Sequence, residues 1–247
     1  MLQVGWKYFP FNEVSINIPN LDNSLKGVKI LQLSDLHLTK KVNLKYLNTL
    51  VEKINALEVD LVVFTGDLIQ TAAINIQVQL ATFSKLLAPC YFVSGNHEMV
   101  YGYKALETEL QKLGIKCLDN QKEIIYINNT ALQLVGLSDR YGFVRGVKRD
   151  YKKLFSSLDE DLTTILLAHQ PKDVKLTKGY KIDLQLSGHT HGGQIAPFTK
   201  IVKIFQPFFA GLYKHEGTQL FVTRGLGYWG VSIRYKSAPE IPVFTIS

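Results

Sequence analysis

The first half of the chain repeats one local pattern three times: a short, largely apolar run, a polar loop, and a stretch with helical spacing of apolar residues. The apolar runs cover residues 28–33, 60–65 and 90–94, and the pattern predicts helices over 44–57, 72–87 and 102–113. A strand that is apolar on both faces is typical of a sheet with a layer on each side. The repeat therefore predicts an α/β fold.

After residue 114 the pattern changes to short strands at close spacing. We expect a hairpin of 124–127 and 131–135, a helix over 151–158, buried strands over 163–168 and 182–186, and closing strands over 219–223, 230–234 and 242–246. Residues 14–18 are expected to form an edge strand, and residues 194–217 an irregular stretch. Because the chain shows no repeat or linker, we interpret residues 1–247 as a single domain with two sheets.

The composition is that of a folded protein with an excess of positive charge. Of the 247 residues, 46% are hydrophobic and 20% are charged, and the formal net charge is +7. This charge favours anionic partners such as phosphate esters, anionic membrane surfaces or nucleic acid, although solvated surface lysines would give the same excess. Two cysteines, Cys90 and Cys117, do not make a disulfide framework and are interpreted as buried thiols.

The sequence contains no signal for crossing or leaving a membrane. It has no run of 18 apolar residues, and Met1–Lys7 lacks the basic and apolar regions of a signal peptide. We therefore expect a cytoplasmic protein that can lie peripherally at the inner membrane. An exported or membrane-anchored protein is the alternative, if a further N-terminal segment precedes this sequence.

Side chains suited to metal binding and catalysis gather directly after the apolar strands. Open α/β sheets bind ligands beyond the carboxyl ends of their strands. One histidine alone would be read as a surface or core residue, but five at the same kind of position favour a common site. In extended backbone the side chains of residues i and i+2 point to the same side, so the imidazoles of His189 and His191 can point towards one place. The residues concerned are Asp35, His37, Asp67, Asn96, His97, His169, His189 and His191.

The chemistry of this group favours a metal centre. Imidazole nitrogens, carboxylate oxygens and one amide oxygen, with no thiolate, suit Zn²⁺, Mn²⁺ or Fe rather than a structural cysteine-rich zinc site. The ligands outnumber the needs of one catalytic ion, whereas two ions that share a carboxylate would use them all. Two ions about 3.5–4 Å apart stabilise the attacking and leaving oxygens of a displacement at phosphorus. The expected cofactor is therefore a pair of divalent metal ions.

The order of these motifs resembles the calcineurin-like metallophosphoesterase family. The blocks Asp-x-His, Gly-Asp, Gly-Asn-His-Glu, His and Gly-His-x-His follow one another between Asp35 and His191. The resemblance implies a four-layer α/β/β/α sandwich of two mixed sheets and a binuclear metal centre. It implies that His97 is not a ligand but stabilises the transition state and protonates the leaving oxygen, while Glu98 fixes the loop. The implied ligands are Asp35, His37 and His191 for the first ion, Asp67 as the bridge, and Asn96, His169 and His189 for the second.

Further motifs resemble the YkuE/YaeI-type bacterial branch of that family. This branch includes phosphodiesterases and the UDP-2,3-diacylglucosamine pyrophosphatases of lipid A synthesis. The resemblance implies a metal-dependent hydrolase of phosphodiester or pyrophosphate bonds, with an amphiphilic, lipid-linked or nucleotide-sugar substrate. A phosphomonoesterase acting on a phosphoprotein or nucleotide is the alternative; a catalytically inactive scaffold is the non-enzyme alternative, which the complete ligand set disfavours. The motifs are Ile18-Pro19-Asn20-Leu21, His189-Thr190-His191-Gly192-Gly193-Gln194-Ile195, Ala210-Gly211-Leu212-Tyr213, and Thr223-Arg224-Gly225-Leu226-Gly227 followed by Arg234 and Pro239-Glu240.

Two other segments carry less specific signals. Residues Ile195 to Tyr213 are rich in apolar and aromatic side chains, and we interpret them either as a lip that contacts a membrane or acyl chains, or as a loop packed over the sheet. A basic loop that could bind a diphosphate or lipid headgroup, with a solvated loop as the alternative, is formed by Arg140, Arg145, Lys148 and Arg149. Arg224 could reach the site or form a structural ion pair. Nucleic-acid binding is not expected, because no basic–aromatic binding element is evident, and the sequence predicts no oligomeric state.

Overall fold

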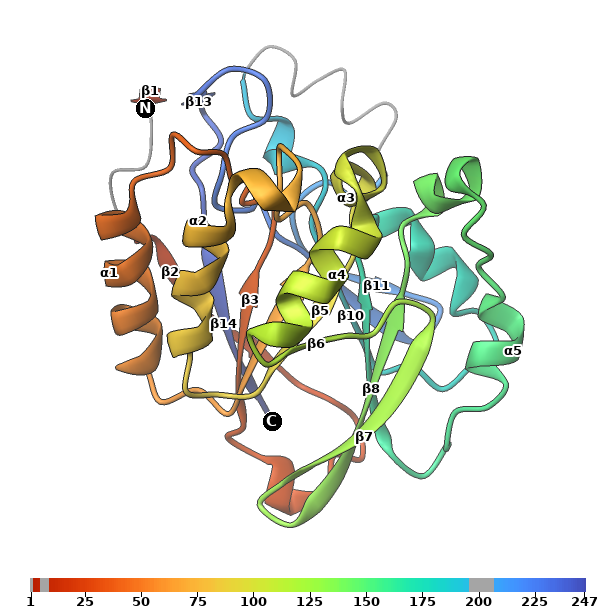
Figure 1. Ribbon diagram of the computed structural model, residues 1–247. Coiled ribbons are helices and arrows are strands. Elements are labelled where there is room, and N and C mark those ends of the chain that lie inside the picture. The colour runs from red at the N-terminus through yellow and green to blue at the C-terminus, as the bar shows by residue number, and fades with distance from the viewer. Residues whose placement is uncertain (1, 5–8, 196–206) are drawn as a thin grey trace.

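Two six-stranded mixed sheets pack face to face, and helices lie on their outer sides (Figure 1). The computed structural model describes residues 2–4, 9–195 and 207–247. The first sheet contains, in spatial order, β2 (Phe11–Ile16), β14 (Ile241–Ile246), β3 (Lys29–Leu33), β4 (Leu61–Thr65), β5 (Cys90–Val93) and β6 (Ile115–Cys117). The second contains β11 (Gly211–His215), β12 (Thr218–Val222), β10 (Leu184–Ser187), β9 (Thr163–Ala168), β8 (Thr130–Leu137) and β7 (Gln121–Ile127).

Each sheet has a parallel centre. β3, β4, β5 and β6 run parallel, with Ile30 opposite Leu61, and β14 lies antiparallel to β3. In the second sheet β8, β9, β10 and β12 run parallel, flanked by antiparallel β7 and β11. The carboxyl ends of the parallel strands in each sheet therefore meet at one edge.

Apolar side chains from both sheets fill the space between them. Val63 and Phe244 of the first sheet belong to the same buried cluster as Leu167 and Leu186 of the second. Burial of a side chain of this size stabilises a fold by about 1.5–3 kcal/mol. This shared core holds the two sheets together as one body.

A buried polar contact joins the sheets at the edge where their parallel strands end. The side-chain amide of Gln32 donates to Thr65 Oγ1 (2.7 Å) and to the carbonyl oxygen of Ser187 (3.1 Å) in the other sheet. A buried amide without partners would cost about 1–3 kcal/mol, so these bonds favour one alignment of the strand ends. The residues predicted for the metal site follow directly after this edge.

Helices cover the outer face of each sheet, and the expected four-layer α/β/β/α architecture is confirmed. The side chain of Asn43 caps the first helix by accepting a hydrogen bond from the Lys45 amide (2.8 Å). This helix buries one apolar face, made of Leu47, Leu50, Val51 and Ile54. On the first sheet lie α1 (Leu44–Asn55), α2 (Gln77–Ala81) and α4 (Tyr103–Lys112), and on the second α5 (Tyr151–Phe155) (Figure 1).

The single helix predicted over 72–87 is wrong. This stretch contains a 3-10 helix (Ala73–Asn75), the short α2, and a second 3-10 helix (Thr82–Lys85). The hydroxyls of Thr82 and Ser84 bond the carbonyl oxygens of Gln79 (2.6 Å) and Ala81 (2.8 Å) and so compete with the regular helical pattern. Among the described residues, no helix has the length and apolar character needed to cross a membrane.

A second helix boundary also differs from the prediction. A helix, α3 (Asn96–Tyr101), begins directly after β5, before the expected start at Gly102. Gly102 has a left-handed conformation (φ 109°), which separates α3 from α4. The start of α3 places Asn96 and His97 in a fixed turn at the strand end.

The irregular stretch predicted over 194–217 is wrong in part, because Gly211–His215 forms the edge strand β11. Its alternation of half-buried and exposed residues matches an edge position. In the predicted membrane lip, residues 196–206 lie outside the described part; at its end, Phe208 packs edge-on against Tyr213 (5.5 Å between ring centroids). The closing strand predicted over 230–234 is β13 (Ile233–Tyr235), which pairs only with β1 (Leu2–Val4) among the described strands.

Candidate metal centre

Every residue predicted for the metal site lies at the carboxyl end of a parallel strand. Asp35 and His37 follow β3, Asp67 follows β4, Asn96 and His97 begin α3 after β5, His169 follows β9, and His189 and His191 follow β10. Five of these residues have positive φ: Asp35 (53°), His37 (48°), Asp67 (52°), His189 (70°) and His191 (50°). Non-glycine residues adopt this conformation at a cost, which surrounding structure must offset, and such strain gathers at functional sites.

The first cluster of ligand-type side chains consists of Asp35, His37 and His191. One ligand atom from each lies within 4.8 Å of the others. His191 Nε2 is 3.4 Å from Asp35 Oδ1 and 3.0 Å from His37 Nε2. All three side chains are buried. The geometry matches three ligands around one ion.

The second cluster consists of Asp67, His169 and His189. His169 Nε2 is 3.3 Å from Asp67 Oδ2 and 3.2 Å from His189 Nδ1. The same carboxylate oxygen of Asp67 lies 3.8 Å from His37 Nε2 in the first cluster. Asp67 therefore lies between the two clusters, which is the place of a bridging ligand.

Asn96 supplies a separate indication of an ion. Its Oδ1 atom is buried and makes no hydrogen bond to the residues that the structure describes. An unsatisfied buried amide oxygen costs about 1–3 kcal/mol, and a cation would satisfy it. Together with the nitrogen and carboxylate donors, this atom fits the ligand preference of Zn²⁺, Mn²⁺ or Fe. The residues present therefore fit a dimetal centre.

His97 lies beside both clusters. Its Nε2 is 3.8 Å from Asp67 Oδ2, and its main-chain amide donates to Asp67 Oδ1 (2.9 Å). The ring stands edge-on to that of His37, with 4.5 Å between ring centroids. His97 Nδ1 is buried and makes no hydrogen bond to any described residue. Nε2 is therefore the ring nitrogen of His97 that faces the two clusters.

Burial shifts the pKa values of the side chains in both clusters. Loss of solvent lowers the pKa of His37 to about 4 and the pKa of His189 to about 3, and it lowers the pKa of His191 well below its ordinary value. Burial acts to raise the pKa of Asp67, but the nearby imidazoles, His169 foremost, hold it below its usual range. Burial raises the pKa of Asp35 to about 6. Burial acts to lower the pKa of His169 as well, but the Asp67 carboxylate raises it well above its ordinary value. At neutral pH the site therefore offers ionised carboxylates and the neutral imidazoles of His37, His189 and His191, which are the forms that bind metal, whereas His169 would release its proton when an ion binds.

Hydrogen bonds behind the ligands orient their rings. His37 Nδ1 lies 2.8 Å from Gln70 Oε1, and His169 Nδ1 donates to the carbonyl oxygen of Thr65 (2.8 Å). The buried guanidinium of Arg234 donates to the ring Nδ1 of His191 (3.2 Å). Such partners fix the ring and the tautomer of a ligand histidine. The sequence assigned no site role to Gln70 or Arg234; Arg234 was visible only as part of a branch motif.

Glu98 fixes the loop and does not enter the site. Its carboxylate accepts hydrogen bonds from four main-chain amides, those of Asp67 (2.8 Å), Leu68 (2.8 Å), Ile69 (3.2 Å) and Gly95 (2.6 Å). The predicted loop-fixing role of Glu98 is confirmed. One buried side chain thereby holds the Asp67 loop and the Asn96–His97 turn together.

Two glycines allow the loops to approach the carboxylates. A Cβ atom at Gly188 would clash with Ser34 Oγ and Asp35 Oδ2, and one at Gly95 would clash with Asp67 Oδ1. Ser34 Oγ also donates to Asp35 Oδ2 (2.6 Å). The two glycine positions thus leave room for the two carboxylates that face the metal clusters.

The three arginines predicted to bind substrate lie outside the two clusters. Arg140 pairs with Asp173 (3.4 Å), and Arg224 pairs with Glu240 (2.7 Å), which also accepts the Arg224 amide. For Arg224 the structure has the ion-pair alternative that the sequence left open. Arg145 is exposed. Substrate binding by Arg140, Arg145 and Arg224 stays a prediction.

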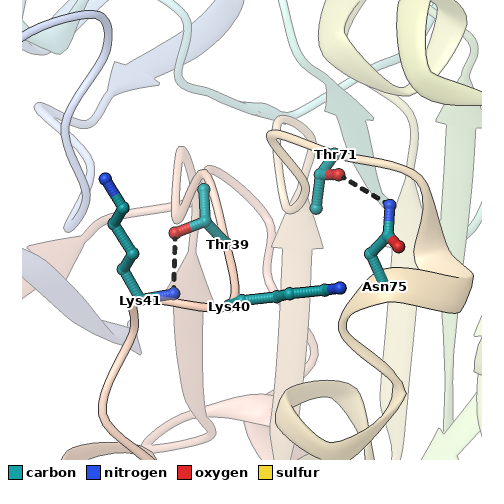
Figure 2. Close-up of a pocket in the computed structure, with 5 residues that line it drawn as sticks. All are labelled: Thr39, Lys40, Lys41, Thr71 and Asn75. Atoms are coloured by element: carbon teal, nitrogen blue, oxygen red, sulfur yellow. Dashed lines mark hydrogen bonds between the residues drawn. The ribbon is translucent and has the colours of Figure 1, made fainter.

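A hollow with two lysines in its lining is formed by residues that follow His37 and Gln70 in the chain (Figure 2). Its volume is about 450 Å³, and it begins two residues after His37 and one residue after Gln70. The Lys41 amide donates to Thr39 Oγ1 (3.2 Å) and Asn75 Nδ2 donates to Thr71 Oγ1 (3.1 Å), which shapes its walls. The lining residues are Thr39, Lys40, Lys41, Thr71 and Asn75. Lys40 and Lys41 give this hollow positive charge.

Comparisons with known proteins agree with the site. Residues 28–193 match the calcineurin-like phosphoesterase family. An uncharacterized metallophosphoesterase of Helicobacter pylori is 37% identical over 226 residues, and this chain spans only 60% of its length (90% of this chain). The uncharacterized metallophosphoesterase YkuE of Bacillus subtilis is 33% identical over 247 residues, 95% of this chain and 84% of that protein. The UDP-2,3-diacylglucosamine pyrophosphatase LpxG of Chlamydia muridarum is 29% identical over 280 residues, 91% of this chain and 85% of that protein.

The fold has solved relatives as well. A 5′-nucleotidase precursor of Thermus thermophilus superposes with a TM-score of 0.56 at 16% identity, over 81% of this chain and 49% of that one. At 16% identity, this structural similarity shows the fold alone. The family match, by contrast, covers most of the chain and includes every residue of the two clusters. The chain belongs to the calcineurin-like metallophosphoesterase family.

Proposed function

We propose that this protein uses two divalent metal ions to hydrolyse phosphodiester or pyrophosphate bonds. The observation that carries the proposal is the pair of His/Asp clusters that meet at Asp67. Manganese, zinc and iron all match the donor set. The first ion would be held by Asp35, His37 and His191, the second by Asn96, His169 and His189, and both by Asp67.

When bound, such ions make a water nucleophilic near neutral pH and neutralise the charge on the phosphoryl oxygens. The residues of the chain supply position and proton transfer. Asp67 is ionised at neutral pH and lies between the two clusters. His97 stands beside them with its Nε2 3.8 Å from Asp67 Oδ2, so this nitrogen can contact the phosphoryl group and protonate the leaving oxygen. Glu98 keeps the His97 turn in register with Asp67.

The substrate we propose is an amphiphilic phosphate ester, of which a nucleotide-sugar lipid such as UDP-2,3-diacylglucosamine is the leading example. The similarity to LpxG supports this class. The hollow lined by Lys40 and Lys41, which follow His37 closely in the chain, supports an anionic headgroup (Figure 2). An amphiphilic substrate also fits a protein that works at a membrane surface.

Three substrates test the reaction class. We expect the purified protein with Mn²⁺ to hydrolyse a bis-aryl phosphate and UDP-2,3-diacylglucosamine faster than an aryl monophosphate. Turnover of the monophosphate alone would favour the phosphomonoesterase alternative. If no substrate is turned over with Mn²⁺, Zn²⁺ or Fe²⁺, the catalytic proposal fails and the inactive scaffold is favoured.

A variant of His97 tests its role. His97→Ala should lower kcat by about 10²–10⁴ towards a diester with a poor leaving group, and much less towards one whose leaving group needs no proton. His215→Ala is the control, because His215 lies at the end of β11 and packs edge-on against Phe208 (5.6 Å between ring centroids). Equal losses for both leaving groups would remove the proton-donor role.

A further inference from the structure

The segment from Arg140 to Lys153, called the 140–153 segment below, combines exposed apolar side chains with concentrated positive charge. Phe143 is 83% exposed and Val144 is 69% exposed. Isolated apolar residues on a surface need no explanation, but an aromatic and an aliphatic side chain side by side in a basic setting do. Six basic residues and one acidic residue give the segment a net charge of +5, against +7 for the chain. The basic residues are Arg140, Arg145, Lys148, Arg149, Lys152 and Lys153, and the acidic one is Asp150.

The base of the segment is held firmly. Asp139 caps the 3-10 helix Arg140–Arg145 by accepting from the Tyr141 amide (2.7 Å), and Gln170 donates to the other oxygen of the same carboxylate (2.9 Å). Arg149 donates to the buried carboxylate of Asp173 (2.7 Å). The exposed tip of the segment, Phe143 and Val144, therefore projects from a turn that is already held in place, which lowers the entropic cost of binding a partner.

The segment lies beside the metal centre. A Cβ atom at Gly142 would lie 3.5 Å from Met99 Cε. Met99 is on α3, two residues after His97. A membrane or protein surface that bound Phe143 and Val144 would therefore also lie close to the His97 side of the metal centre.

We propose that the 140–153 segment docks the protein on an anionic phospholipid bilayer. Phe143 and Val144 enter the boundary between headgroups and acyl chains. The exposed basic residues that are attracted to the lipid phosphates are Arg145, Lys148, Lys152 and Lys153, whereas Arg140 and Arg149 pair with Asp173. Charge complementarity favours an anionic bilayer over a protein partner. A neutral apolar groove would bind Phe143 and Val144 but would leave the net charge of +5 without a counterpart. This inference rests on the proposed function only in its consequence. A protein docked on the bilayer can reach an amphiphilic substrate while the substrate stays in the bilayer.

Vesicle binding by the full chain tests the proposal. The vesicles are phosphatidylcholine alone, or phosphatidylcholine with about a third phosphatidylglycerol, and binding is measured by co-sedimentation in 0.1 M salt. The paired variant Phe143→Ser, Val144→Ser should bind the anionic vesicles at least about tenfold less than the unmodified protein. The matched control is Leu87→Ser, because Leu87 is 82% exposed but precedes β5, at the end of that strand away from the metal centre. This control should bind like the unmodified protein.

A second paired variant tests the charge. Lys152→Ala, Lys153→Ala should weaken binding to anionic vesicles about tenfold and make binding less dependent on salt. Turnover of the water-soluble bis-aryl phosphate should be unchanged in all these variants, so a failed docking surface is distinguished from a failed phosphoesterase.

Three results would overturn the proposal. The first is that the unmodified protein does not bind anionic vesicles. The second is that the Phe143→Ser, Val144→Ser variant binds as well as Leu87→Ser. The third is that the unmodified protein binds a single-stranded DNA oligonucleotide more tightly than the vesicles, with an affinity that depends on Lys152 and Lys153 but not on Phe143 and Val144.

Discussion

Arg234 holds His191 by both its main chain and its ring, across 43 residues of sequence. The guanidinium donates to the carbonyl oxygen of His191 (3.3 Å) and to its Nδ1 (3.2 Å), and it also donates to the carbonyl oxygens of Arg224 (2.8 Å) and Gly227 (2.6 Å). Ser237 adds a bond to the same His191 carbonyl (2.7 Å). The C-terminal segment thus closes over the loop that presents the last predicted ligand.

We predict that Arg234→Met weakens metal binding by about 10- to 100-fold, because a ligand histidine without its outer partners loses orientation. Arg234→Lys should fall between the variant and the unmodified protein, since an ammonium group cannot reproduce the planar fork of a guanidinium. Metal affinity is measured by competition with a chelator. Arg145→Met, at an exposed arginine, is the control and should bind metal normally. Unchanged affinity in Arg234→Met would contradict the prediction.

Asn96→Ala should lower the metal content from about two ions to about one per chain, measured by elemental analysis after dialysis. The same change removes a buried oxygen that no described residue satisfies, so it should raise the thermal stability of the chelator-treated protein, by about 1 kcal/mol. Asn75→Ala, at the exposed rim of the hollow, should do neither. Retention of two ions by Asn96→Ala would remove Asn96 from the ligand set.

Gly188→Ala should destabilise the protein by about 1–3 kcal/mol and reduce its metal content, because the added methyl group meets Ser34 and Asp35. The comparison is Gly27→Ala, where the methyl group would meet no atom within 4 Å but the backbone has a positive φ of 85°. That variant should lose some stability and keep its metal. Thermal melting and metal analysis of both proteins separate the two effects; full metal content in Gly188→Ala would contradict the steric argument.

The free energy of unfolding should depend on pH through the titration of His37. Its pKa is lowered from about 6.5 to about 4 by burial, so the unfolded chain binds its proton more readily than the folded chain. The contribution of neutral His37 is therefore intact above pH 6.5 and is lost as the pH falls towards 4, by about 1 kcal/mol per pH unit. In chelator-treated protein, the stability of the unmodified chain minus that of His37→Gln should fall over this range. A difference that is flat with pH would show that His37 titrates normally in the folded protein. Subtracting the variant removes the opposing effect of Asp35, whose pKa burial raises to about 6.

Local pattern was enough to predict much of the fold and of the candidate site. Apolar runs such as residues 60–65 and 163–168 are strands, and the polar residues that follow them lie together at one edge. This succeeds because a strand buried on both faces and a tight turn after it depend mainly on neighbouring residues. The loop-fixing role of Glu98 was predicted as well, through the family resemblance.

Other features depended on contacts between distant parts of the chain. The pairing of β1 with β13 joins residues more than two hundred positions apart. Arg234 is buried behind His191, whereas Arg140 and Arg224 pair with Asp173 and Glu240. The partner of each arginine lies far from it in the sequence, so the residues next to it do not show which carboxylate or imidazole it will contact.

The sequence by itself determined which residues end the strands and hence which side chains can reach a metal. Only the tertiary structure showed how closely these side chains gather, that Arg234 supports them, and that Phe143 is left exposed next to Gly142, which lies near Met99. The physical reason is that strand and turn formation are governed by local spacing of apolar and polar residues. The partner of a charged or aromatic side chain, by contrast, is selected by burial and by the packing of two sheets whose strands are far apart in the chain.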